Sequence, residues 1–156
     1  MLLPNDQYEL NKMNSTAAKV ALGDKLHQQV GCLKGTYNFA TQGGAVGDYN
    51  LKDSNGVSVT LPAKAIVQNV MVHVVTALTS GGSATIDLNL QSANDLLAAE
   101  AVASFSANAK IQGIPDFATL ADAVITSATR TLTLSVNVAA LNDGKINVFV
   151  YYVLSE

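Results

Sequence analysis

The chain has 156 residues, about the length of one domain. Hydrophobic residues make up 49% of it and charged residues 13%, against about 25% charged residues in an average soluble domain. The hydrophobic content excludes a disordered chain, and a single cysteine, Cys32, excludes a disulfide framework within the chain. A net charge of -3 provides no basic field for a nucleic-acid backbone, and no apolar run reaches the roughly 18 residues of a membrane span. Because charge is so sparse, we expect an oligomer or a component of a larger assembly.

Residues 1–34 are predicted to form an arm and one helix. Their start lacks the basic residues and apolar core of a secretory signal, so we expect a protein made and used in the cytoplasm or built into a particle there. From residue 15 to residue 30 an apolar residue recurs at every fourth position, which draws a stripe along one helix face: Ala18, Leu22, Leu26 and Val30. An isolated helix of this length is only marginally stable in water, so we expect the stripe to pack against something. The candidates are its own domain, further copies of the chain about a symmetry axis, and a partner protein. Residues 1–13 are expected to form an extended arm, with these anchors: Leu2, Leu3, Tyr8 and Leu10.

From Gly35 onward the hydrophobic period changes from about four residues to two, which is typical of β-strands. Residues 84–91, 131–138 and 145–154 alternate in this way. Residues 66–76 are apolar on both faces, which favours a central strand covered on both sides or a strand whose outer face meets another subunit. Weaker strands are expected at 36–40, 57–61 and 122–127, whereas residues 94–104 fit either a helix or an alanine-rich strand.

Turn signals separate these strands. Asn142-Asp143-Gly144 predicts a hairpin between strands 131–139 and 145–154, and residues 80–83 predict another between strands 65–78 and 84–91. Asn55-Gly56 and the glycine-rich residues 43–47 are further turns. Many short strands with turns between them predict an all-β fold, a sandwich or a barrel. We expect two parts, residues 1–34 for anchoring and oligomerisation and residues 35–156 as the β-domain.

The residues that carry chemistry are scattered. His27 and His73 have no second histidine or carboxylate at ligand spacing, so no metal site is expected, and His73 is predicted to lie in the core or an interface. Cys32 follows the expected helix end and is predicted to be a structural thiol. The chain has no tryptophan and only 6% aromatic residues, which offers little stacking surface to sugars or bases. We therefore predict no enzyme, no cofactor and no small-molecule substrate.

Several segments carry a resemblance: GTYNFATQGGAVGD at 35–48, LTSGGSATIDL at 78–88, RTLTLSV at 130–136 and ALNDGKINV at 140–148. They resemble the small head-decoration, or capsid cement, proteins of tailed bacteriophages, and the similarity covers residues 35–156. The resemblance implies a jelly-roll-like antiparallel β-sandwich and a homotrimer on the outer capsid surface of the virion. It also implies the major capsid protein as partner and a structural role that stabilises the shell. It carries over no functional residue.

The residue-based interpretation agrees with this resemblance, because a cement protein acts by burying surface between neighbouring subunits. We expect the arm to lie on the shell and the helix to pack about the trimer axis. The alternative is a head-fibre or receptor-binding module that recognises host surface glycans. A sugar-cleaving or lyase enzyme that uses a carboxylate such as Asp87 or Asp116, and a small-ligand β-barrel, are further alternatives. The strand order, the oligomer number and the capsid-facing side do not follow from the sequence.

Overall fold

The computed structural model describes residues 30–115 and 123–155. The chain divides into two compact units, Met1–Val30 and Gly31–Glu156. The predicted arm lies outside the described residues, and so does the predicted helix except for its last residue, Val30. The second unit begins with a strand at Gly31, so residues 31–34 belong to a sheet of the β-domain.

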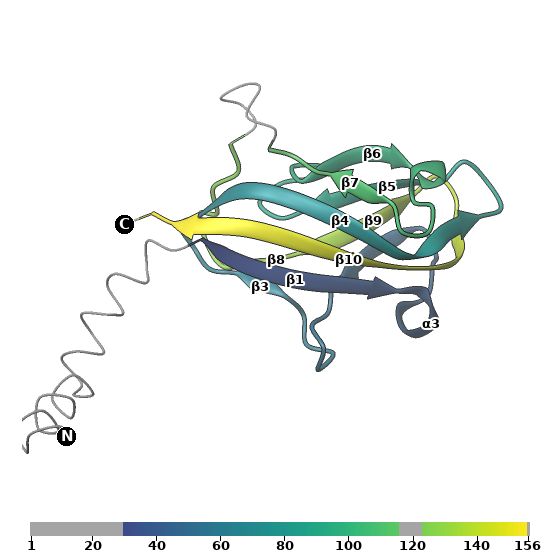
Figure 1. Cartoon of the computed structure of the whole chain (residues 1–156), viewed down its shortest axis with the longest axis horizontal. Coiled ribbons are helices and arrows are strands. Elements are labelled where there is room, and N and C mark those ends of the chain that lie inside the picture. The colour runs from purple at the N-terminus through teal and green to yellow at the C-terminus, as the bar shows by residue number, and fades with distance from the viewer. Residues whose placement is uncertain (1–29, 116–122, 156) are drawn as a thin grey trace, which may run out of the picture. The chain divides into compact units, whose positions relative to one another are not determined.

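Two four-stranded antiparallel sheets pack against each other in this unit (Figure 1). The first sheet has the order β1 (Gly31–Asn38), β10 (Leu141–Leu154), β4 (Ala65–Ser80) and β7 (Lys110–Gln112). The second sheet has the order β2 (Gly47–Asn50), β9 (Thr133–Asn137), β5 (Thr85–Asn89) and β6 (Leu97–Ala101). Strands β3 (Thr60–Leu61) and β8 (Arg130–Thr131) form a small third sheet. The remaining elements are the short helix α3 (Phe39–Gln42) and a 3-10 helix (Val102–Ser104). The predicted antiparallel β-sandwich is confirmed.

The connectivity of the two large sheets is that of a jelly roll. Strand β5 pairs with β6, β4 with β7, β2 with β9 and β1 with β10, as if the chain were folded in half between β5 and β6. The doubled ribbon then wraps so that β10 lies beside β4 and β9 lies beside β5. Along the chain, the strands of the two sheets therefore change sheet at every step except from β5 to β6.

Two predicted hairpins are wrong for this reason. Residues 80–83 carry the chain from β4 in the first sheet to β5 in the second sheet. Asn142-Asp143-Gly144 lies inside β10, where the register with β4 shifts between successive pairs. The prediction at Asn55-Gly56 is confirmed, because the Gly56 N–H donates to the Asp53 carbonyl oxygen at 3.2 Å and Gly56 has a φ of 78°. A turn signal therefore identifies neither the sheet in which the next strand lies nor, at residues 142–144, a reversal of the chain, since these residues make an irregularity within one strand.

The structure confirms some of the weaker predicted strands and shortens others. Of residues 94–104, which the sequence leaves open between helix and strand, the last eight form strand β6 followed by the 3-10 helix. The strand expected at 36–40 is the end of β1 and stops at Asn38, whose side chain accepts a hydrogen bond from the Ala40 N–H at the start of α3. The strand expected at 57–61 contains β3. Of the strand expected at 122–127, the described part makes an isolated bridge between Ile125 and Ile66.

Alternating side chains from both sheets form the hydrophobic core. Leu134 and Val136 of β9 and Leu88 of β5 are fully buried, as the period of two predicts. Val138 was expected on the same face but is 74% exposed, because β9 has ended and Val138 adopts a φ of 70°. The core residues with no exposed surface are Tyr37, Leu51, Leu61, Ala65, Val67, Val70, Val72, Val74, Ile86, Leu88, Leu96, Phe105, Leu132, Leu134, Val136, Ile146, Val148 and Val150.

Strand β4 is central in the first sheet, between β10 and β7. Its register with β10 shifts beside Tyr152, so Val67 and Val70 both face the core although they are three residues apart. The opposite side of β4 carries half-buried and exposed side chains, including Met71, His73 and Val75. Residues 66–76 therefore have one buried face and one outer face, and the expected strand covered on both sides within the chain is wrong. That the outer face meets another subunit stays a prediction.

Candidate interaction face

The predicted interface residues of the arm and helix are not tested by the structure. Seven of them lie outside the described residues: Leu2, Leu3, Tyr8, Leu10, Ala18, Leu22 and Leu26. The eighth, Val30, directly precedes β1 and is 60% exposed.

The outer side of the second sheet carries a ladder of polar side chains. Asp48 and Asp87 lie on either side of Ser135 in the register of β2, β9 and β5. The Ser135 hydroxyl donates to Asp48 Oδ1 at 2.5 Å, and Asn137 Nδ2 donates to Asp87 Oδ2 at 2.6 Å. Asp87 Oδ1 also accepts from the Ala99 N–H, and Asp87 is only 7% exposed. The hydrogen bonds of these two carboxylates link neighbouring strands, so the contacts of Asp87 are those of a structural residue. Asp116 lies outside the described residues.

A third carboxylate, Asp95, closes the loop after β5. Its two oxygens accept hydrogen bonds from three successive backbone N–H groups at 2.7–2.9 Å: Leu90, Gln91 and Ser92. The loop lines a hollow of about 400 Å³ together with Ile114 and residues 123–125. Because its acceptors are taken up by the backbone, Asp95 holds the loop in shape.

His73 is half-buried on the outer side of β4, because the alternation of β4 turns Val72 and Val74 inward. Of its two predicted positions, the core is therefore wrong, and an interface stays a prediction. Cys32 is exposed within β1, and the predicted helix before it lies outside the described residues except for Val30. In residues 30–115 and 123–155 no three His, Cys, Asp or Glu side chains gather as metal ligands would. None of the helices in those ranges is long and apolar enough to cross a membrane.

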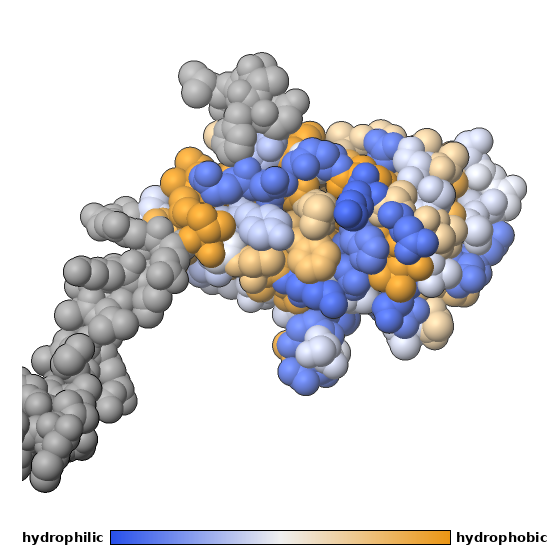
Figure 2. Space-filling view, in the orientation of Figure 1, coloured by the Kyte–Doolittle hydropathy of each residue, from blue (hydrophilic) through white to orange (hydrophobic). Residues whose placement is uncertain are grey.

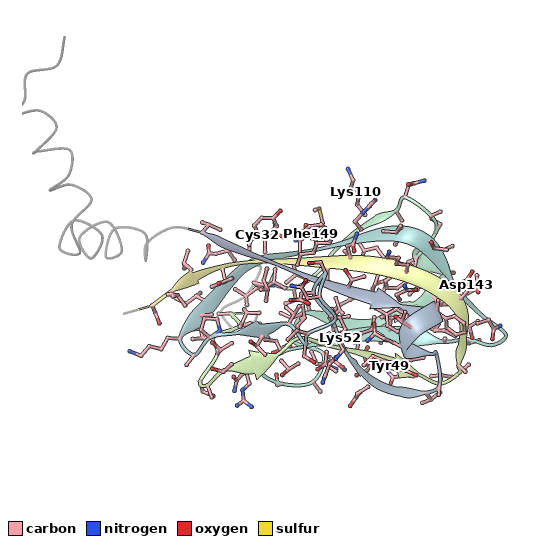
Figure 3. The ribbon with its side chains drawn as sticks, turned by 90° about the horizontal axis from the view of Figure 1, so that it is seen from below. Cys32, Tyr49, Lys52, Lys110, Asp143 and Phe149 are labelled. Atoms are coloured by element: carbon pink, nitrogen blue, oxygen red, sulfur yellow. The ribbon has the colours of Figure 1, made fainter. Side chains whose placement is uncertain are left out.

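The outward side chains of the first sheet form the most distinctive surface of the described residues. We call it the outer face; Figure 2 views the molecule onto it and shows polar and apolar side chains intermixed. Cys32, Phe149 and Lys110 point to this side, away from the second sheet (Figure 3). Strand pairing brings the other members to the same side: Lys34, Thr36, Asn38, Asn69, Met71, His73, Val75, Gln112, Lys145, Asn147 and Tyr151. The charged side chains in this set are all lysines.

One row of the outer face extends beyond the sheet. Thr36 pairs with Asn147 on one side, and Asn147 continues through His73 to Lys110. On its other side Thr36 pairs with Lys52, which in turn pairs with Ser58 across the hairpin of residues 52–58. The Thr36 hydroxyl donates to Asn147 Oδ1 at 2.9 Å, and Lys52 Nζ donates to Ser58 Oγ at 3.0 Å. This hairpin therefore forms a wall beside the outer face.

A cleft of about 680 Å³ lies between that wall and the sheet. Its floor consists of outward side chains of β1 and β10 with Val75 of β4, and its sides are the 52–56 turn and helix α3. Three lysines and one carboxylate line it: Lys34, Lys52, Lys145 and Asp53. Asp53 Oδ1 accepts the N–H groups of Asn55 and Val57, both at 2.8 Å, so this carboxylate stabilises the turn. The cleft thus carries an excess of positive charge in a chain whose net charge is negative.

Two tyrosines lie on opposite sides of the first sheet, Tyr37 on β1 and Tyr151 on β10. Tyr37 faces inward, where its hydroxyl donates to the Gly43 carbonyl oxygen at 2.5 Å and its ring meets Tyr49 edge-on at 5.5 Å. Burial, with a smaller contribution from Tyr49, raises the pKa of Tyr37 to about 12. Tyr151 faces outward opposite Cys32, and that thiol raises the pKa of Tyr151 above its ordinary value, with desolvation adding to the effect. Tyr37 therefore fastens the loop after α3 to the core side of β1.

Sequence reasoning missed this face although it identified most of its strands. The alternation in residues 145–154 correctly separates Asn147, Phe149 and Tyr151 from the core positions. The lysines of the cleft come from three segments that are distant in sequence, and the sequence contains no signal for the neighbours of β1. The pairing of Thr36 with both Lys52 and Asn147 is what brings them together.

Comparisons with known proteins identify the fold. No protein-family model and no curated protein sequence matches the chain. Among solved structures, a chain of the acidic stable capsid structure of Helicobacter pylori bacteriophage KHP30 matches with a TM-score of 0.52 and 19% identity, over 81% of this chain and 89% of that one. A chain of the cyanophage Pam1 capsid asymmetric unit matches with a TM-score of 0.55 and 21% identity, over 80% and 85%.

A third similar chain belongs to the capsid of Ralstonia phage GP4, with a TM-score of 0.54 and 17% identity over 82% of this chain and 86% of that one. Each likeness covers most of both chains, so it concerns the whole β-sandwich and not a shared fragment. The β-sandwich of this chain is a fold that also occurs in chains of three phage capsid structures.

Proposed function

We propose that this chain is a structural component of a phage virion, a decoration or cement protein that binds the major capsid protein on the outer capsid surface as a homotrimer and stabilises the shell. The observation that carries the proposal is the likeness of its β-sandwich to chains of three phage capsid structures, over 80–82% of its length. The resemblance of residues 35–156 to head-decoration proteins supports the same function.

The outer face supports a role in binding other subunits. Phe149, Tyr151 and Met71 lie there half-buried, and Val75, further along β4, is 40% exposed. A surface of this kind gains free energy when a partner covers it, at about 25 cal/mol for each Å² of apolar area removed from water. A capsid presents many copies of its surface, so a modest interface at each site is sufficient for a fully decorated shell.

The experiment mixes the purified chain with capsids of the parent phage assembled without it. We expect co-sedimentation, density on the outer shell by electron microscopy, and a solution mass three times the 16.2 kDa chain mass. Decorated shells should resist heating that opens bare shells. A copy number limited to fibre positions together with binding on a glycan array would replace the proposal with the head-fibre or receptor-binding module.

We further propose that residues 1–29 anchor the chain to the shell through the arm and the striped helix. A chain that starts at Val30 tests this, because Gly31 pairs with Tyr152 and every residue of β1 is needed for the first sheet. We expect this shortened chain to keep the circular dichroism spectrum of the β-domain and to lose capsid binding. Undiminished binding by a folded chain of residues 30–156 would contradict the role of the arm.

A further inference from the structure

We propose that the cleft on the outer face binds an extended, carboxylate-bearing polypeptide segment of a neighbouring capsid protein. The inference rests on the proposed function for the source of that segment, whereas its chemistry follows from the cleft itself. The cleft is bounded by β1, β10, helix α3 and the 52–56 turn and encloses about 680 Å³.

Charge selects the chemical class of the ligand. Lys34, Lys52 and Lys145 line the cleft, and the carboxylate of Asp53 is already hydrogen-bonded to two backbone N–H groups of its own turn. The ammonium group of Lys52 is held by Ser58 Oγ at 3.0 Å, which leaves donors on the same group for a ligand. An anionic ligand is therefore attracted, and a cationic one is repelled.

The positions of the lysines match an extended chain. Lys34 and Asn38 are four residues apart on β1, and Asn38 pairs with Lys145, so the Cα atoms of Lys34 and Lys145 are about 13 Å apart along the strand direction at roughly 3.3 Å per residue. Lys52 lies between these two levels, beside Thr36. An extended segment that runs parallel to β1 presents side chains on one face every two residues, about 6.6 Å apart. Acidic residues at alternate positions of such a segment therefore reach all three lysines.

The uncharged lining favours a polypeptide over a sugar. Thr36, Thr41 and Asn147 supply hydroxyl and amide groups that match the N–H and C=O groups of a peptide backbone. The lining contains no aromatic side chain on which a sugar ring or a base stacks. The cationic groups are lysines, which act as point charges and lack the planar fork with which arginine grips phosphate.

The test uses the full-length chain and a capped hexaglutamate peptide, with hexaglutamine as the uncharged control, in isothermal titration calorimetry at low salt. The informative variant is the double substitution Lys34→Gln with Lys145→Gln. The matched control is Lys64→Gln with Arg130→Gln, which changes the net charge equally but alters no residue of the cleft or of the outer face. Thermal unfolding of each variant verifies that the β-domain is intact.

We expect hexaglutamate to bind and hexaglutamine not to bind, with binding weakened as salt rises. The cleft variant should bind about two- to thirtyfold more weakly, since it loses two exposed ion pairs with the peptide, and the control variant should bind as the unchanged chain does. Equal weakening in both variants, or no binding of hexaglutamate, would overturn the proposal. Tighter binding of tripolyphosphate or of an acidic oligosaccharide such as a hyaluronate fragment would also overturn it.

The same variants separate this inference from the proposed function. If hexaglutamate binds in the cleft but the chain does not bind capsids, the decoration role fails and the site stands. If the chain decorates capsids and the cleft variant decorates them equally well, the inference fails and the decoration role stands.

Discussion

Replacing Gly144 with alanine tests how β10 lies against β4 at the end of the first sheet. The structure places Gly144 inside β10 with a φ of 136°, pressed against the backbone of β4. A hairpin turn at the same residue, as the sequence predicts, would leave it open to solvent. Gly56 provides the matched control, because it has a φ of 78° in a true turn and no atom lies within 4 Å of the position of an added Cβ.

The expected costs of the two substitutions differ. A Cβ on Gly144 collides with the Leu78 side chain and lies 2.8 Å from Leu78 Cα and 3.0 Å from the Ala77 carbonyl oxygen. These last two atoms are backbone and do not rotate away. The backbone conformation costs about 1–3 kcal/mol for a residue other than glycine, and overpacking costs about 1–3 kcal/mol more. Gly56→Ala carries the conformational cost alone, about 1–2 kcal/mol.

Thermal unfolding measured by circular dichroism checks the difference. An unfolding entropy of about 2.1 cal/mol/K per residue gives roughly 0.26 kcal/mol/K for a domain of about 125 residues. Gly144→Ala should therefore lower Tm by about 8–23 °C, and Gly56→Ala by about 4–8 °C. Urea titrations should give the same order of stability. A loss for Gly144→Ala no larger than that for Gly56→Ala would refute the placement of Gly144 against β4.

Two further predictions concern side chains that hold loops in place. The pKa of Tyr37 rises from 10.0 to about 12 in the folded chain, so its stabilising effect is complete below pH 10 and is lost as the pH rises towards 12. A loss of about 2 kcal/mol is expected between pH 10 and pH 12, and urea unfolding of Tyr37→Phe should lack this part of the pH dependence; an identical pH profile would contradict it. Asp95→Ala removes the acceptor for three backbone N–H groups and should lower the free energy of unfolding by roughly 1.5–3 kcal/mol. Hydrogen exchange should accelerate at residues 90–92, and unchanged protection there would show that the carboxylate does not hold the loop.

The sequence by itself determined which side chains enter the core. Strand alternation is a local property of the backbone, so Leu88, Leu134 and Val148 could be assigned to buried faces without knowledge of the sheet partners. The same alternation assigned Phe149 and Tyr151 to the other side of their strand. The sparse charge likewise led to the expectation of an assembled protein, which the proposed function shares. These inferences need only composition and spacing.

Only the tertiary structure decided which strands are neighbours. A turn signal records only which residues tolerate an irregular backbone, and the energy that chooses between a hairpin, a crossing to the other sheet and an irregularity within one strand comes from burying both sheet faces against each other. Strand β10 therefore pairs with β1 and β4, and Thr36 bonds to Asn147, which is 111 residues away. The cleft follows from that choice, since Lys34, Lys52 and Lys145 share no local pattern and meet only because β1 lies between the hairpin and β10.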